Sequence, residues 1–174
     1  MIIRKASLKI IVLLFISVIL SQAQNRNILT PYDVVKFKSV NEVTLSPDGK
    51  LIAYTVLVPR DINDEPGSAY NELFVMNSDG TNNRSFITGK VSVSDISFSP
   101  DGKLILFRGR FADDRSTQIY AIPIDGGEKF KVVESSESIL KYVIHPSGKY
   151  IYFTAQSPIS ENKRNYNKKG FNAI

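Results

Sequence analysis

The sequence predicts an all-β fold, an incomplete β-propeller of about two and a half four-stranded blades, because one turn motif recurs three times between apolar strands. Ser46-Pro47-Asp48-Gly49-Lys50 returns at residues 99–103 as Ser-Pro-Asp-Gly-Lys and at residues 145–149 as His-Pro-Ser-Gly-Lys. The copies begin 53 and 46 residues apart. Repeats of about 40–50 residues are typical of propeller blades. A signal peptide and a short helix are predicted ahead of the first blade.

The chemistry of the motif explains why it joins two strands. Proline presets φ at the second turn position, Asp or Ser can bond the local backbone, and Gly adopts the left-handed conformation that follows. In the first two repeats a third strand closes on an Asp-Gly pair, which is a strong hairpin signal. The predicted strands cover residues 43–45, 51–58, 72–76, 84–88, 96–98, 104–108, 118–124, 129–133, 142–144 and 150–154.

The strands that leave each turn are apolar on both faces. A sheet with one solvated face would alternate apolar and polar residues more cleanly. These strands therefore predict a sheet that is covered on both sides, as a blade is by its two neighbours. The third blade is expected to be incomplete, and a propeller that cannot close its ring leaves strand edges unpaired.

Residues 1–23 have the pattern of a secretory signal peptide. Arg4, Lys5 and Lys9 precede an apolar run from Ile10 to Leu20, and small residues stand at the end of the segment. The run is short for a membrane span, so cleavage after Ala23 is favoured over an uncleaved anchor. The chain is therefore predicted to be exported, to the periplasm or beyond, with no stable membrane anchor after cleavage.

The rest of the chain divides into two predicted segments. Residues 24–40 are expected to form an N-terminal segment with a short helix that starts at Thr30-Pro31 and ends near Phe37. Residues 41–174 form the partial propeller, with blade 1 at about 41–90, blade 2 at about 91–137 and the start of blade 3 at about 138–174. In blade 3, residues 162–169 are expected to form an exposed loop and residues 171–174 to begin a third strand.

The distribution of charge argues against a nucleic-acid partner. The net charge is +5, but the first 23 residues and the segment from Glu161 onward supply all of the excess. Between them stand 15 basic and 16 acidic residues. Binding along a phosphate backbone needs clustered cations, which this part of the chain lacks. With no cysteine, the chain has no disulfide or thiolate metal site, so its stability must come from packing.

With the motif order established, the chain resembles the amino-terminal part of the prolyl oligopeptidase family of serine peptidases, on the acylaminoacyl-peptidase branch. The resemblance covers about Ile28 to Ile174. It is carried by the segment Leu29-Thr30-Pro31-Tyr32-Asp33-Val34-Val35, by the first turn motif, and by the third strands Leu73-Phe74-Val75-Met76 and Ile119-Tyr120-Ala121-Ile122. The turn motif also occurs in TolB-like propellers that are not peptidases.

The resemblance implies a propeller that precedes an α/β-hydrolase domain with a Ser-Asp-His triad. It also implies that the propeller partly covers that site and restricts access to short peptides. No triad residue can be assigned in this chain. A nucleophile elbow needs glycines two residues on either side of the serine, and no two glycines here are four residues apart.

Three groups of polar residues could be mistaken for functional sites. His145, the only histidine, occupies a turn position equivalent to Ser46 and is interpreted as structural. Four of the residues 61–65 carry oxygen side chains, but the segment lacks the glycine and glutamate of an EF-hand, so a polar loop is favoured over calcium binding. The charged residues after the second strand of blade 2 are interpreted as surface ion pairs; they are Arg108, Arg110, Asp113, Asp114 and Arg115.

The sequence therefore predicts an amino-terminal propeller fragment of an exported serine peptidase. It would gate the access of peptides to a hydrolase domain absent from the chain, so the expected partners are that domain and peptides. We expect no catalytic, cofactor-binding or metal-binding residue and no cofactor. The alternative is a stand-alone TolB-like propeller module that binds proteins in the periplasm. The parent protein would hydrolyse short peptides, whereas this chain alone would not.

Overall fold

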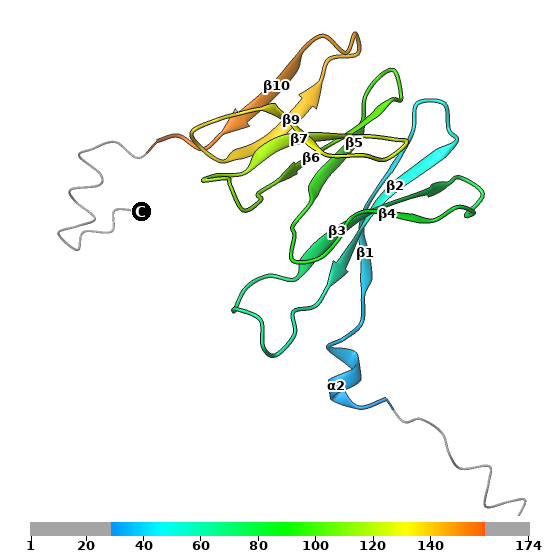
Figure 1. Cartoon of the computed structure of the whole chain (residues 1–174), viewed down its shortest axis with the longest axis vertical. Helices are drawn as coiled ribbons and strands as arrows, with labels where there is room; N and C mark the ends of the chain where they lie inside the picture. Colours follow the sequence, from blue (N-terminus) through cyan, green and yellow to red (C-terminus); the bar gives the residue numbers. More distant parts are fainter. Residues whose placement is uncertain (1–28, 159–174) are drawn as a thin grey trace, which may run out of the picture. The chain divides into compact units, whose positions relative to one another are not determined.

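The computed structural model describes residues 29–158, which contain one short helix and ten strands (Figure 1). The predicted signal peptide and the predicted loop and strand at residues 162–174 lie outside this range. The elements are α2 (Pro31–Val34), β1 (Ser39–Leu45), β2 (Leu51–Val58), β3 (Tyr70–Asn77), β4 (Arg84–Ile87), β5 (Ser94–Phe98), β6 (Leu104–Gly109), β7 (Gln118–Pro123), β8 (Phe130–Val133), β9 (Ile139–Ile144) and β10 (Ile151–Ala155).

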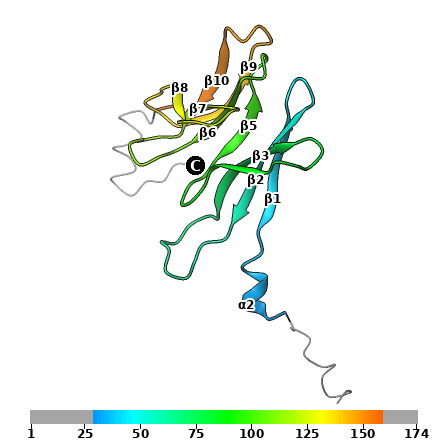
Figure 2. The same ribbon diagram turned by 45° about the vertical axis from the view of Figure 1, so that its right-hand side comes forward.

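The strands form three antiparallel sheets that follow the sequence repeats. The sheet orders are β1-β2-β3-β4, β5-β6-β7-β8 and β10-β9 (Figures 1 and 2). We call these sheets blade 1, blade 2 and blade 3. Each of the first two repeats therefore supplies four strands, as predicted, and the described part of the third supplies two. This confirms the predicted all-β architecture.

The first strand of each blade begins earlier than the sequence predicts. β1 starts at Ser39 and continues past a bulge between Val40 and Val43, while β5 carries a bulge between Ser94 and Ser97. The polar residues at these bulges interrupt the alternation that marks a strand, so the pattern hides the first residues. Pairing with the long second strand of the blade extends the first strand across the bulge.

The turn motif has the same hydrogen bonds in blades 1 and 2. In blade 1 the Ser46 hydroxyl donates to Asp48 Oδ1 at 2.7 Å, and the Leu51 amide donates to Ser46 Oγ at 2.9 Å. Gly49 has a φ of 72°, the left-handed conformation that favours glycine. The motif therefore fixes the register of two strands through its own side chains.

The second strand of blade 2 is buried on both faces, as predicted. Successive residues of β6 contribute to different apolar clusters: Ile105 and Phe107 pack toward blade 1, and Leu106 packs toward blade 3. The cluster between blades 1 and 2 contains Ala53, Leu73, Val75, Ile87, Val93, Ile96, Phe98, Ile105, Phe107, Tyr120 and Ile122. The cluster toward blade 3 contains Leu106, Ile119, Ala121 and Ile139.

The outermost described faces are not covered in the same way. Val43 of β1 is 64% exposed and Tyr152 of β10 is 61% exposed.

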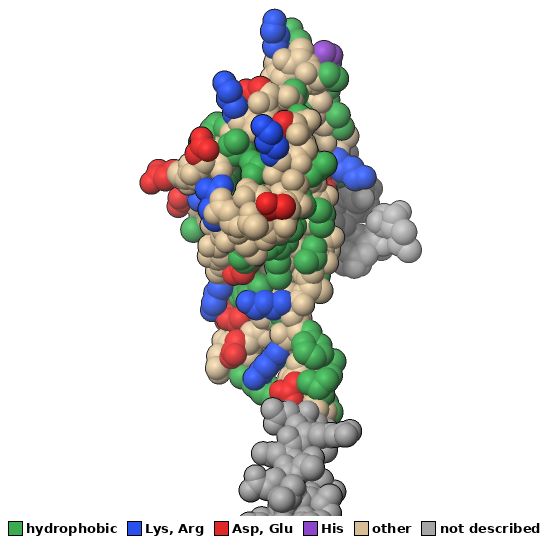
Figure 3. All heavy atoms as spheres, turned by 90° about the vertical axis from the view of Figure 1, so that its right-hand side faces the viewer, with side chains coloured by type: hydrophobic (Ala, Val, Ile, Leu, Met, Phe, Trp, Pro, Cys, Tyr) green, Lys and Arg blue, Asp and Glu red, His purple; other side chains and the backbone are tan. Residues whose placement is uncertain are grey.

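Figure 3 shows that Lys and Arg side chains lie dispersed among Asp, Glu and apolar groups on the face that it presents. Within residues 29–158, no helix has the length and apolar character needed to cross a membrane.

The helix α2 begins as the sequence predicts but ends earlier. The Thr30 amide donates to Asp33 Oδ2 at 2.9 Å, and the Asp33 amide donates to Thr30 Oγ1 at 3.3 Å, which completes a capping box. The helix ends at Val34, with Val35 as its C-cap, and not near Phe37. None of its four residues is buried, so the helix lacks the packing of an apolar face that would stabilise further turns.

Replacing Phe107 with alanine should remove a central part of the core. Phe107 is fully buried, and its ring stacks on Tyr120 with a centroid distance of 5.9 Å. We expect Phe107→Ala to lower the free energy of unfolding by about 3–5 kcal/mol in urea titration. Ile62→Ala, at a side chain that is 88% exposed, should change it by less than about 0.5 kcal/mol. Equal effects of the two substitutions would contradict the described packing.

Candidate functional site

The connections between strands place one set of loops at the same end of blade 2. Because antiparallel strands reverse direction, the β6–β7 loop and the β8–β9 connection leave from one end, and the Ser-Pro-Asp-Gly turn leaves from the other. A pocket of about 390 Å³ lies between these two connections. Its lining comes from residues 113–116, 118, 131 and 134–136, and we call it the loop pocket.

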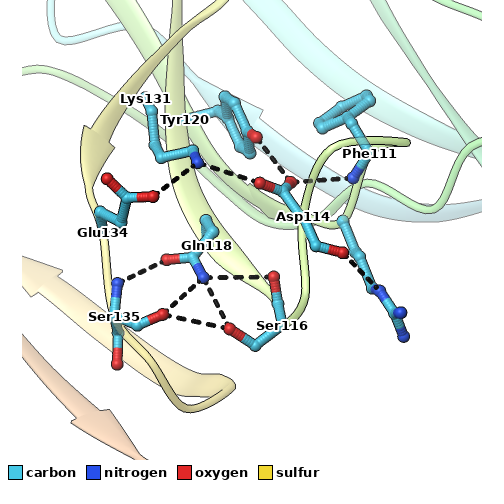
Figure 4. Close-up of polar contacts among 9 residues, drawn as sticks. Phe111, Asp114, Ser116, Gln118, Tyr120, Lys131, Glu134 and Ser135 are labelled. Atoms are coloured by element: carbon cyan, nitrogen blue, oxygen red, sulfur yellow. Dashed lines mark hydrogen bonds and ion pairs between the residues drawn. The ribbon is translucent and has the colours of Figure 1, made fainter.

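Asp114 is the buried centre of the loop pocket (Figure 4). Its carboxylate accepts hydrogen bonds from Tyr120 Oη at 2.6 Å and from the Phe111 amide at 2.9 Å, and it pairs with Lys131 Nζ at 3.1 Å. Its side chain is only 1% exposed. The prediction of a surface ion pair is therefore wrong for Asp114, because the loop folds its carboxylate inward onto β7 and β8.

The charges of this network favour its present ionisation state. Burial raises the pKa of Asp114, but the hydrogen bonds from Tyr120, Phe111 and Lys131 outweigh it and hold that pKa below its usual range. Burial and the adjacent Asp114 carboxylate raise the pKa of Tyr120 to about 12. Hydrogen bonds to Asp114 and Glu134 raise the pKa of Lys131. At neutral pH the network is a carboxylate, a phenol and an ammonium, an arrangement that anchors the loop.

Gln118 ties the two sides of the loop pocket together. Its Nε2 donates to Ser116 Oγ at 2.7 Å and to the Ser135 carbonyl at 2.8 Å, and its Oε1 accepts from the Ser135 amide at 2.8 Å (Figure 4). In blade 1, Glu72 Oε1 accepts from the Gly89 amide at 2.7 Å. Glu72 and Gln118 each stand seven residues before the Asp of the Asp-Gly turn, a shared spacing that could have revealed this bridge in the sequence.

Arg108 is separate from the loop pocket and joins blade 2 to blade 3. Its Nε pairs with Asp95 Oδ2 at 2.5 Å, and its Nη1 donates to the Ile139 carbonyl at 2.9 Å. The Arg108 side chain is 19% exposed. Arg108 therefore forms an ion pair, as predicted, but this pair is partly buried and lies where blade 2 meets blade 3. Nothing in the sequence pattern indicated Asp95 as its partner, because a bulge with a left-handed φ of 51° at Asp95 sets this geometry.

The remaining charged residues of this group lie at the loop pocket. Arg110 Nε donates to the Asp114 carbonyl at 3.3 Å. Asp113 and Arg115 are exposed and line the pocket. The fold therefore brings together four of the five predicted charged residues and gives Arg108 a different partner.

His145 lies in the turn between β9 and β10, as predicted. Its Nδ1 lies 2.7 Å from Ser147 Oγ and accepts a hydrogen bond from the Ser147 amide at 3.1 Å. The Gly148 amide donates to the His145 carbonyl at 2.8 Å, as the Gly49 amide does to Ser46. The histidine ring therefore takes part in the hydrogen bonding of its own hairpin turn.

The loop at residues 61–65 is held by internal hydrogen bonds and one ion pair. The Asp61 amide donates to Asp64 Oδ2 at 2.9 Å, and Asn63 Nδ2 donates to Asp61 Oδ1 at 3.0 Å. Asp64 also pairs with Lys90 Nζ at 2.6 Å, and this bond holds the pKa of Asp64 below its usual range. In the described range 29–158, no group of three or more His, Cys, Asp or Glu side chains is placed to hold a metal ion.

Repeated four-stranded antiparallel sheets, packed face to face and joined at their loop ends, define this chain as part of a β-propeller. Solved structures agree on this fold. TolB from Acinetobacter baumannii superposes with a TM-score of 0.55 at 21% identity, over 71% of this chain and 29% of that protein. The β-propeller domain of the Trilobed protease from Pyrococcus furiosus gives 0.51 at 18% identity, over 68% and 34%.

Curated relatives are peptidases. The chain is 25% identical over 146 residues to dipeptidyl-peptidase 5 from Porphyromonas endodontalis. This alignment covers 84% of this chain and 20% of that protein. It is 25% identical over 129 residues to the uncharacterized peptidase YuxL from Bacillus subtilis, which covers 74% and 19%. The chain spans about a fifth of the length of these relatives. No protein-family model matches it. The predicted resemblance to a propeller part of peptidases is confirmed.

Neutralising Asp114 should destabilise the loop pocket in a pH-dependent way. Because Asp114 has a lowered pKa in the folded chain, its contribution is present above the unfolded pKa of about 3.9 and is lost as pH falls through the folded pKa. We expect Asp114→Asn to lower the free energy of unfolding by about 1–3 kcal/mol at pH 7. The difference from the wild type should shrink below pH 4.

Denaturant titrations at pH 7 and pH 3 measure both values. Asp113→Asn is the matched control, since the neighbouring Asp113 is exposed and its loss should cost less than about 0.5 kcal/mol. A difference between Asp114→Asn and wild type that is the same at both pH values would show that the charge of Asp114 does not stabilise the fold.

Proposed function

We propose that this chain is the propeller part of an exported serine peptidase of the prolyl oligopeptidase family. In this role it restricts the access of peptides to a hydrolase domain encoded beyond residue 174. The observation that carries the proposal is the alignment with dipeptidyl-peptidase 5, which extends over 84% of this chain but only 20% of that protein. A match of this kind is what one folding unit of a larger peptidase would give.

The structure supports the proposed role through its rigidity at the loop end. Asp114 and Gln118 each hold a loop or connection of blade 2 against its strands by several hydrogen bonds. A surface that selects substrates by size must keep its shape, and buried polar networks of this kind rigidify the loops that they join. The proposed role places the selectivity in the shape of the propeller, and the chemistry in the other domain.

The proposal includes the segment boundaries inferred from the sequence. Residues 1–23 would direct export and be removed, residues 24–40 would lead into the propeller, and residues 41–174 would form its first blades. The basic start, the apolar run and the small residues before Ala23 support export. The periplasm is the compartment proposed for the mature protein.

A serine-reactive probe tests the proposal. We expect a fluorophosphonate to label the product of the complete gene at one serine, and to leave the present chain unlabelled, because a strained nucleophile elbow requires glycines that this chain does not have at the needed spacing. The same proteins should differ in hydrolysis of short acylated peptide amides. Stoichiometric labelling of a serine within residues 24–174, or a complete gene product that is not labelled, would contradict the proposal.

A second candidate is a stand-alone TolB-like propeller that binds other proteins. The TM-score of 0.55 to TolB from Acinetobacter baumannii, over 71% of this chain, favours it at the level of the fold. The two candidates differ in the sequence beyond residue 174. A Gly-x-Ser-x-Gly frame there supports the peptidase, and further Ser-Pro-Asp-Gly repeats with no hydrolase domain support the binding module.

A further inference from the structure

A groove of about 560 Å³ lies between blades 1 and 2, beside the outer strands β4 and β8. Residues 86–88 and 91 line it from blade 1, and residues 111, 122 and 127–129 line it from blade 2. We call it the outer groove. Both blades are four-stranded sheets. A further blade would pack on the opposite face of blade 1 or on blade 3, so it would not fill this groove.

The floor of the outer groove is apolar, and strand register shows that its side chains face one another. Ile87 of β4 pairs with Leu73, and Ile122 of β7 pairs with Ile105. All four side chains are buried members of the cluster between blades 1 and 2. The outer groove is therefore the open edge of that cluster.

Three partly buried apolar side chains form the walls. Phe86 and Val91 from blade 1 and Phe111 from blade 2 pack against the same cluster and keep part of their surface exposed. Around them stand the exposed residues Thr88 and Glu128. Apolar surface with a polar rim is typical of a site that another protein contacts.

Phe111 is a fixed wall of the outer groove. Its ring meets the Tyr120 ring edge to face, with a centroid distance of 4.8 Å, and the Phe107 ring at 6.4 Å. Its amide donates to Asp114 Oδ2 at 2.9 Å. Because both the ring and the backbone of Phe111 are held, a ligand would not have to order this wall, and the entropic cost of binding is reduced.

One ammonium group lies against this wall. Lys129 Nζ is 4.2 Å from the centroid of the Phe111 ring, and it makes no ion pair within residues 29–158. Lys131 is already paired with two carboxylates. A cation held beside an apolar surface complements an acidic group that stands next to an apolar side chain.

We propose that the outer groove binds an extended segment of another protein, in which an aromatic residue stands next to an acidic one. The aromatic ring contacts Phe111 and the apolar floor, and the acidic side chain pairs with Lys129. A small ligand would need a pocket that encloses most of its surface, whereas the rim residues Thr88, Glu128 and Lys129 are exposed. The inference is independent of the peptidase assignment, because it uses only the packing of two four-stranded blades.

A pair of tripeptides tests the outer groove. The probes are acetyl-glutamyl-tryptophyl-glutamyl amide and its uncharged counterpart, acetyl-glutaminyl-tryptophyl-glutaminyl amide, each titrated into the isotope-labelled full chain and followed by NMR of the backbone amides. We expect shifts at residues 86–91, 111 and 127–129. The glutamate peptide should bind about two- to fivefold more tightly, the range for one exposed ion pair. This preference should weaken as salt is raised.

Variants at the rim give changes of opposite sign. Lys129→Ala should abolish the preference for the glutamate peptide, and Lys129→Arg should retain it. Glu128→Gln should increase the preference, because it removes a negative charge beside the acidic ligand. Lys103→Ala, at an exposed lysine in the turn of blade 2, is the matched control and should leave the preference unchanged.

Four results would overturn the proposal. They are equal binding of the two peptides, a preference that survives in Lys129→Ala, shifts confined to residues outside the outer groove, and the absence of shifts with either peptide. Decanoate provides the comparison with a lipid. Shifts of the groove amides with decanoate but with neither peptide would assign the groove to an acyl chain instead of a protein segment.

Discussion

Burial of both faces of a blade is the constraint on which the rest of this structure depends. Ile105 and Phe107 pack toward blade 1 while Leu106, between them in the sequence, packs toward blade 3. A sheet of this composition cannot expose either face to water without losing most of its hydrophobic stabilisation. Blade 2 therefore needs a neighbour on each side, and the repeats before and after it in the sequence supply these neighbours.

Hydrogen bonds from polar side chains fix how adjacent blades are oriented, which apolar packing alone does not specify. Arg108 connects the Asp95 carboxylate of blade 2 with the Ile139 carbonyl of blade 3, and Tyr142 bonds back to the Asp95 carbonyl. Hydrophobic contacts are non-directional, whereas these hydrogen bonds have a narrow range of distance and angle. They set how the first strands of blades 2 and 3 are placed relative to each other.

The network at the loop pocket has a structural role in this fold. In the loop pocket, the carboxylate of Asp114 is bonded to three donors and its charge is matched by Lys131. A buried charge that is paired in this way stabilises the fold.

The sequence by itself determined the repeated turns, nearly every strand, the position of His145 in a turn and the resemblance to peptidases. These are local features, because turn chemistry and apolar patterning act over a few residues. Only the tertiary structure decided that Asp114 is buried, that Arg108 pairs with Asp95, and that β1 and β5 continue past their bulges. Each of these depends on residues distant in the chain, and the spacing of charges along a loop does not reveal which of them will fold inward.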